Sequence, residues 1–164
     1  MYRRIVRERV QALFDAVNGG DAQPVLDAFA TRFEHVFLGN HALAGRRTTL
    51  TATKDWYDRL FRLLPDISFD VHRIDVAGPP WATLVTVEWS ETNSATDGVR
   101  TFATGVHVVH LKWGRMTRLL ILHDTVPLTH TLERTHETSG GESMAEAIDE
   151  TPGWPGPETQ PREA

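Results

Sequence analysis

The stretch VHVVHLKWGRMTRLLILHDT, from Val106 to Thr125, carries the main structural signal of this sequence. Its two halves are rich in Val, Leu and Ile, which is typical of buried β-strands. Trp113 and Gly114 separate the halves, and a two-residue connection of this kind predicts a tight hairpin turn. The apolar run is nevertheless interrupted by ionisable side chains, namely His107, His110, Arg118, His123 and Asp124.

The length of the turn sets which side chains share a face of the hairpin. If the turn has only two central residues, Lys112 pairs with Arg115 and all other partners follow from that pair. This register places His107 and Asp124 on the same face, and it places His123 on the opposite one. Both faces are mostly apolar, so we expect one to close over helices and the other to meet a partner subunit or more of the same chain.

Length and charge indicate one folded domain followed by a tail. A chain of 164 residues is long enough to bury a core, and the absence of cysteine excludes disulfides, thiolate nucleophiles and cysteine zinc sites. The net charge of −5 lies in the tail, because residues 133–164 contain eight acidic and two basic residues. We predict a folded domain over residues 1–132 and an acidic, Pro- and Gly-rich tail over residues 133–164, mostly disordered from about Thr138.

The same composition excludes several partners. The near-neutral folded part offers no basic stripe for phosphate groups, so we expect no nucleic-acid partner. No apolar run approaches the ~18 residues that a membrane-spanning helix needs. The N-terminal segment MYRRIVRERV also lacks the apolar centre of a signal peptide. We therefore expect a cytoplasmic protein without a membrane partner.

Helices come first along the chain and strands follow. Apolar residues at helical spacing predict a first helix that ends at Asn18-Gly19-Gly20, a second helix capped by Asp21, and a third over Leu50–Leu64. Period-two segments predict strands over Phe33–Leu38, Ile67–Val76, Trp81–Thr92, Val99–Trp113 and Arg115–Leu128. Helices followed by an antiparallel meander predict an α+β fold.

Common catalytic and cofactor motifs are missing from the sequence. It contains no glycine-rich dinucleotide motif, no P-loop and no GxSxG nucleophile motif. His107 and His110 are three residues apart on one strand, so without a bulge their side chains point to opposite faces and cannot share a metal ion. We expect neither a metal ion nor another cofactor.

Three stretches resemble the SnoaL-like branch of the superfamily that includes ketosteroid isomerase, limonene epoxide hydrolase and nuclear transport factor. They are Phe14–Asp21, the segment from Gly45-Arg46 to Leu63–Phe69, and the segment from Phe102 to Asp124. The resemblance implies a cone-like α+β barrel, in which a curved antiparallel sheet wraps around the N-terminal helices and leaves a deep apolar pocket. It also implies enzymes that usually need no cofactor, and dimers that form through the outer sheet face.

Carried over by position, the resemblance implies an acid–base aspartate at Asp124 and a histidine of the same pocket at His107. An apolar pocket would make the carboxylate a stronger base, and His107 would donate a hydrogen bond to a developing enolate oxygen. The candidate ligand-binding residues are Phe14, His35, Phe37, Asn40, Trp56, Val87, Trp89, Val109 and Leu122.

We therefore predict a cofactor-independent enzyme of the cyclase or isomerase type that acts by acid–base chemistry on an apolar carbonyl-containing small molecule. Two alternatives remain open. The first is a non-catalytic domain that binds an apolar small molecule, with Asp124 paired to Arg118. The second is a homodimeric assembly domain that uses its sheet face and acidic tail. An enclosed cavity faced by both Asp124 and His107 would favour the enzyme.

Overall fold

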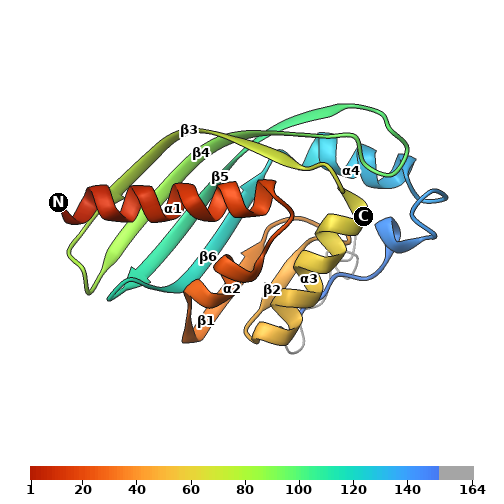
Figure 1. Cartoon of the computed structure of the whole chain (residues 1–164). Coiled ribbons are helices and arrows are strands. Elements are labelled where there is room, and N and C mark those ends of the chain that lie inside the picture. The colour runs from red at the N-terminus through yellow and green to blue at the C-terminus, as the bar shows by residue number, and fades with distance from the viewer. Residues whose placement is uncertain (152–164) are drawn as a thin grey trace, which may run out of the picture.

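A computed structural model describes residues 1–151 of the protein, which form a mixed α+β domain as predicted (Figure 1). The helices are α1 (Tyr2–Asn18), α2 (Gln23–Ala28), α3 (Leu50–Leu63) and α4 (Thr125–Arg134), with a 3₁₀ turn η1 (Glu142–Met144). The strands are β1 (Phe29–Phe37), β2 (Gly45–Arg47), β3 (Ser68–Ala77), β4 (Thr83–Asn93), β5 (Thr101–Lys112) and β6 (Arg115–His123). None of these helices is both long and apolar enough to span a lipid bilayer.

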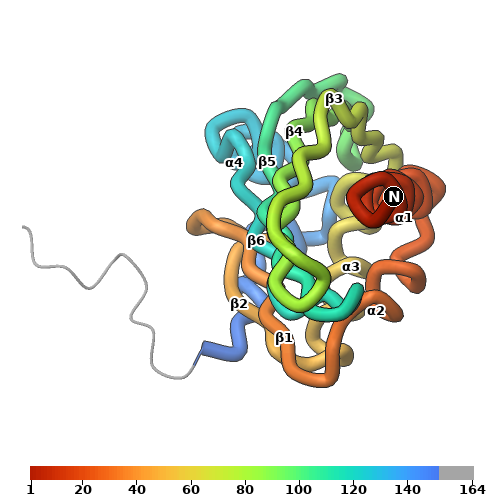
Figure 2. The backbone as a smooth tube through the Cα atoms, turned by 90° about the vertical axis from the view of Figure 1, so that its left-hand side faces the viewer, coloured from red at the N-terminus to blue at the C-terminus, as the bar shows by residue number. Residues whose placement is uncertain are grey.

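Helix α1 lies across one face of the curved sheet (Figures 1 and 2). Its apolar stripe is buried against that face and consists of Val6, Val10, Phe14 and Val17. The helix ends at Asn18, whose side-chain amide donates to the carbonyl oxygen of Phe69 at 2.9 Å and accepts from its backbone N–H at 2.7 Å. This two-way bond holds the end of α1 against β3, so the inward face of the sheet and α1 enclose the core.

The six strands form one open sheet in the order β2-β1-β6-β5-β4-β3. Neighbouring strands are antiparallel except β1 and β6, which run parallel. The expectation of a wholly antiparallel sheet is therefore wrong at this pair. Strands β1 and β6 are distant in sequence, so the path of the intervening chain, and not a hairpin turn, decides their relative direction.

The predicted two-residue turn joins β5 to β6. Trp113 and Gly114 both have positive φ, at 54° and 76°, which is the geometry of the turn that best matches the twist of a hairpin. Lys112 pairs with Arg115 as expected. The turn prediction is therefore confirmed.

Beyond the turn, the predicted register is wrong by one residue. Thr117 forms a bulge in β6, so Gly105 pairs with His123 instead of Leu122. The bulge keeps Arg118 out of the core and brings its Nε to 3.5 Å from Oε2 of Glu34. As a result, His123 and not Asp124 shares the inward face with His107.

The predicted strand over Arg115–Leu128 is too long, because β6 ends at His123 and helix α4 follows. The Asp124 carboxylate accepts a hydrogen bond from the N–H of Val126 at 3.3 Å and so caps α4. Pro127 occupies the first turn, a position that proline tolerates. The apolar alternation in the sequence masked this helix start.

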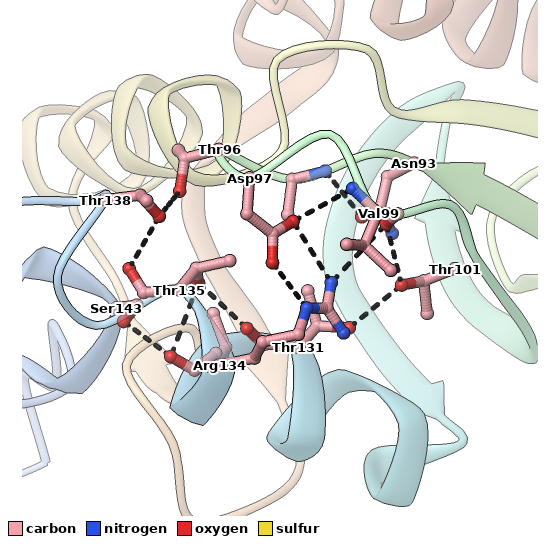
Figure 3. Close-up of polar contacts among 12 residues, drawn as sticks. Asn93, Thr96, Asp97, Val99, Thr101, Thr131, Arg134, Thr135, Thr138 and Ser143 are labelled. Carbon is pink, nitrogen blue, oxygen red and sulfur yellow. Dashed lines mark hydrogen bonds and ion pairs between the residues drawn. The ribbon is translucent and has the colours of Figure 1, made fainter.

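Polar side chains fasten α4 to the loop between β4 and β5, as Figure 3 shows. The guanidinium of Arg134 donates to the carboxylate of Asp97 and, at 3.4 Å, to the carbonyl oxygen of Val99. The hydroxyls of Thr131 and Thr101 lie 3.2 Å apart. These contacts hold α4 in place while its Leu128, only 3% exposed, packs into the core.

Residues 138–151, expected to be disordered, return along α3 and β2 in the structure. The Glu142 carboxylate accepts from Arg62 at 2.6 Å, and the carbonyl oxygen of Ile148 accepts from Arg47 at 2.9 Å. The Glu150 N–H donates to the carbonyl oxygen of Arg46 at 2.7 Å. We call residues 142–151 the strap. Polar contacts hold the strap in place, so its low apolar content led to the prediction of disorder. The rest of the predicted tail, residues 152–164, lies outside the described residues. Helix α4 crosses the predicted boundary between residues 132 and 133.

Candidate functional site

A cavity of about 140 Å³ lies between α1, α3 and the inward face of the sheet. Its wall is almost entirely apolar, because the buried stripes of both helices and the inward side chains of the strands converge there. A dry apolar cavity of about 150 Å³ accommodates benzene in another protein, so this one suits a compact apolar molecule. Besides Tyr2 and Arg9, the polar residues of the wall are Tyr57, His107 and His123.

Six of the residues proposed from the sequence lie on the cavity wall, namely His107, Phe14, Phe37, Trp56, Trp89 and Val109. The rings of Phe14 and His107 are in edge contact, with centroids 5.0 Å apart. Trp89 lies beside His107 on one side and beside His123 on the other, with centroids 5.4 Å away in each case. The structure therefore brings this part of the proposed site together.

The other five proposed residues do not line the cavity. Val87 and His35 are fully buried but lie outside the wall, and Asn40 is exposed in the loop after β1. Leu122 is 38% exposed, and Asp124 is exposed at the start of α4. The expected inward orientation of Asp124 and Leu122 is wrong because the bulge in β6 turns both residues outward.

His107 is held as a neutral imidazole on the wall. Its Nδ1 accepts a hydrogen bond of 2.7 Å from the indole N–H of Trp89. Burial, and to a lesser degree the nearby His123, lowers the pKa of His107 to about 3. At neutral pH this ring is therefore unsuited to take up a proton.

His123 stands next to a buried carboxylate. Its Nδ1 lies 2.7 Å from the carbonyl oxygen of Asp124, and a carbonyl only accepts, so Nδ1 carries a proton. Its Nε2 lies 3.4 Å from Oε1 of Glu91, whose side chain is 1% exposed. The amide of Asn93 donates to both oxygens of Glu91, at 3.2 and 3.1 Å. The carboxylate of Glu91 is therefore fixed beside Nε2 of His123.

Tyr57 is a further polar residue of the cavity wall. The residue is 5% exposed, and burial raises the pKa of Tyr57, so the hydroxyl keeps its proton. Among residues 1–151 this hydroxyl has no hydrogen-bond partner, which leaves it free to meet a ligand oxygen.

A buried His35–Arg47 pair supports the wall from behind. Nε of Arg47 donates to Nδ1 of His35 at 2.8 Å, and the guanidinium lies 5.2 Å from the ring centroid of Trp56. Burial lowers the pKa of Arg47 to about 10, and burial followed by the charge on Arg47 holds the pKa of His35 well below its usual value. The pair fixes Trp56, which lines the cavity.

The described part of the chain contains no cluster of three or more His, Asp or Glu side chains suited to a metal ion. The histidines that approach one another do so around Trp89 and not around a shared metal position.

Sequence reasoning missed His123, Glu91 and Tyr57. The sequence did contain one sign that His123 faces inward. Without a bulge, the hairpin register would bury Arg118 in an apolar core, and burial of an unpaired charge is costly. A bulge before Arg118 avoids that cost and reverses the facing of every later residue in β6. Glu91 carried no such signal, because His123 lies on another strand and only the folded sheet brings the two side chains together.

The comparison with known families assigns the chain. The SnoaL-like domain family matches residues 10–119, which is more than half of the sequence. The protein therefore belongs to the SnoaL-like domain family, as its sequence motifs indicated. The sequence has no significant match among curated proteins.

Solved structures share the fold at low sequence identity. An NTF2-like protein of unknown function from Burkholderia pseudomallei aligns with a TM-score of 0.66 and 16% identity, covering 79% of this chain and 94% of its own. A protein with a ketosteroid isomerase-like fold from Catenulispora acidiphila, in complex with trimethylamine, gives 0.65 and 14%, covering 76% and 91%. AclR from Streptomyces galilaeus, a proposed hydroxylase, gives 0.63 and 15%, covering 78% and 95%. These similarities establish the NTF2/ketosteroid isomerase-like fold.

Proposed function

We propose that this protein binds a small apolar carbonyl compound in its cavity and, without a cofactor, catalyses a proton transfer on that compound. One observation supports this most directly. Two histidine rings in different surroundings, His107 held neutral beside Trp89 and His123 beside the Glu91 carboxylate, lie on the wall of a largely apolar cavity. Pairs of titratable groups whose surroundings set them apart are typical of acid–base sites.

His123 takes the role that the sequence suggested for Asp124. Its Nδ1–H is held by a backbone carbonyl, so Nε2 is the atom that removes a proton from the carbon next to the substrate carbonyl. The broken C–H bond supplies the electron pair of the enolate, and the Glu91 carboxylate stabilises the imidazolium that forms. Return of the proton to a different carbon would isomerise the compound.

The developing negative charge falls on the carbonyl oxygen. In an apolar cavity, hydrogen-bond donors stabilise such an oxygen more strongly than they do in water. His107 and the Tyr57 hydroxyl are the donors on the wall that suit this role.

The size of the cavity limits the substrate. Pockets for drug-sized ligands usually measure about 300–1,000 Å³, whereas this cavity measures about 140 Å³. A substrate of about one six-membered ring fits this volume. A larger compound would have to extend beyond this volume.

A test of the chemistry uses cyclohexanone as the probe. We expect the wild-type protein in D₂O to accelerate exchange of the protons next to the carbonyl, measured by NMR. His123→Gln should reduce this acceleration by roughly 100-fold or more, the usual contribution of a general base. His110→Gln is the matched control, because His110 is an exposed histidine on β5.

The possible failures of this test are distinct. If cyclohexanone binds and the wild type does not accelerate exchange, the protein is a binding domain and the acid–base proposal is wrong. If exchange is equally fast in wild type and His123→Gln, the base is a different group.

We also propose that two copies of the protein associate through the outer face of the sheet. Large apolar side chains are exposed there, including Leu84 (40%), Phe102 (60%) and Leu122 (38%). Leu122→Glu should convert a dimer to a monomer in sedimentation velocity experiments. Leu50→Glu, at an exposed leucine on α3, should leave the dimer intact. A wild-type monomer at high concentration would contradict this proposal.

A further inference from the structure

The indole of Trp89 determines which nitrogen of His107 carries the proton. Its N–H can only donate, and it donates to Nδ1 of His107 at 2.7 Å. The Nδ1 atom is therefore an acceptor and carries no proton. A neutral imidazole in this arrangement carries its single proton on Nε2.

Trp89 has little freedom to leave this position. It is 1% exposed, and the ring of Phe69 meets its indole edge-on, with centroids 5.0 Å apart. Its partner on β5 is Gly105, where an added Cβ would overlap the indole ring and the carbonyl oxygen of Leu122. Glycine at this position gives the indole its place beside His107.

The second nitrogen of His107 is without a partner in the described part of the chain. His107 lines the cavity, and its neighbours there are the apolar rings of Phe14 and Phe69, with centroids 5.0 and 6.3 Å away. A ligand that supplies an acceptor to this nitrogen gains a hydrogen bond and therefore affinity.

We propose that Trp89 is a positioning residue that fixes His107 as a hydrogen-bond donor toward the cavity, so that the cavity selects ligands presenting an acceptor, such as a carbonyl oxygen. This inference deepens the proposed function and rests on it only in taking the cavity as the ligand site. In this arrangement His107 donates a hydrogen bond to the ligand oxygen, and His123 removes the proton.

The first experiment needs no ligand. Long-range ¹H–¹⁵N NMR correlations distinguish the two neutral forms of a histidine ring, and we expect His107 of the wild type to show the form protonated on Nε2. Trp89→Phe, which keeps an aromatic ring and removes the donor, should give a mixture of both forms. Trp56→Phe is the matched control, because the Trp56 indole lines the same cavity and donates elsewhere, to the carbonyl oxygen of Leu43.

Two results of this experiment would overturn the inference. One is a wild-type His107 protonated on Nδ1. The other is a folded Trp89→Phe protein in which His107 still carries its proton only on Nε2. If that variant does not fold, the wild-type spectrum still decides which nitrogen carries the proton.

The second experiment measures selection with two probes of equal shape. Cyclohexanone carries a C=O group where methylenecyclohexane carries a C=CH₂ group, so only cyclohexanone offers a hydrogen-bond acceptor. We compare the ratio of the two dissociation constants in the wild type with the same ratio in His107→Phe. The difference in hydration between the two free probes is the same for both proteins and cancels in this comparison. Loss of one hydrogen bond should shift this ratio by roughly tenfold toward the alkene.

Failure of this inference is distinguishable from failure of the proposed function. If both probes bind and the ratio does not change in His107→Phe, selection by His107 is wrong and the cavity remains a ligand site. If neither probe binds, the assignment of the cavity as a ligand site is wrong.

Discussion

Asp124 and His123 are adjacent in the chain but serve different parts of the molecule. The His123 ring lines the cavity, whereas the Asp124 side chain caps α4 at the surface. Both roles follow from the facing of β6, which alternates strictly once the bulge at Thr117 has been passed. The chemistry at neighbouring residues therefore depends on strand register more than on residue type.

Substitution of Asp124 should affect stability and leave the site unchanged. Asp124→Ala removes the cap of α4, and we expect a loss of about 1 kcal/mol in the free energy of unfolding, measured with urea. Asp124→Asn should retain most of the stability, because asparagine is also a good cap. Both variants should bind cyclohexanone like the wild type, and a large loss of binding in Asp124→Asn would show that this carboxylate does reach the cavity.

Three histidines that the fold removes from water make the stability of the protein dependent on pH. Burial is the main cause that lowers the pKa of His107 to about 3, the pKa of His41 to about 4 and the pKa of His35 well below its usual range. The unfolded chain takes up these protons near pH 6.5, while the folded chain does not. Each histidine therefore stabilises the fold above that pH, and its contribution is lost as the pH falls toward the folded value.

The expected slope can be measured. Below about pH 6.5, His107 alone should reduce the free energy of unfolding by about 1.4 kcal/mol per pH unit. Urea unfolding of His107→Gln between pH 6 and pH 4 should show a slope that is shallower by about that amount. Equal slopes in the two proteins would mean that His107 is already protonated in the folded state.

The β5–β6 hairpin places a large side chain in an unfavourable conformation. Trp113 is 67% exposed and has φ = 54°, a region that asparagine and glycine tolerate better than other residues. Its ring lies 5.8 Å from that of Trp81 in the β3–β4 turn, so a contact between two turns offsets part of the cost.

Two substitutions at Trp113 separate these effects. Both Trp113→Asn and Trp113→Ala remove the contact with Trp81, but only asparagine relieves the backbone conformation. We expect Trp113→Asn to be more stable than Trp113→Ala by roughly 0.5–1 kcal/mol in urea unfolding. Equal stabilities would show that the turn tolerates any residue at this position.

Over the whole molecule, the strap connects parts of the chain that are about one hundred residues apart. The carboxylate of Glu150 accepts hydrogen bonds from the N–H groups of Thr48 and Thr49, at 2.6 and 3.0 Å, immediately before α3. Negative charge is favourable at the N-terminal end of a helix. Because α3 forms one wall of the cavity, the strap helps to set the position of that wall.

Removal of the Glu150 charge should loosen this end of α3. We expect Glu150→Gln to lower the free energy of unfolding by about 1 kcal/mol. The N–H groups of Thr48 and Thr49 should also exchange faster with D₂O, as followed by NMR. Glu137→Gln, at an exposed glutamate before the strap, is the control. Unchanged exchange at both amides would contradict the role assigned to Glu150.

The sequence was sufficient where local pattern and local turn chemistry determine structure. The apolar stripe of α1, the Trp113-Gly114 turn and the α+β order of elements were predicted correctly, because each depends on residues close together in the chain. The resemblance to the SnoaL-like family, and not local pattern alone, suggested Phe14, Trp89 and His107 as site residues.

Tertiary structure decided the features in which distant groups compete. The bulge at Thr117 turns Arg118 out of the core toward Glu34 on β1, and the parallel pairing of β1 with β6 depends on the path of the chain between them. A one-residue bulge reverses the facing of the strand that follows it, so the bulge at Thr117 decides that His123, and not Asp124, reaches the cavity. Local pattern shows that a register without a bulge would bury Arg118, but the position of the bulge is decided only in the folded chain, where the possible registers compete.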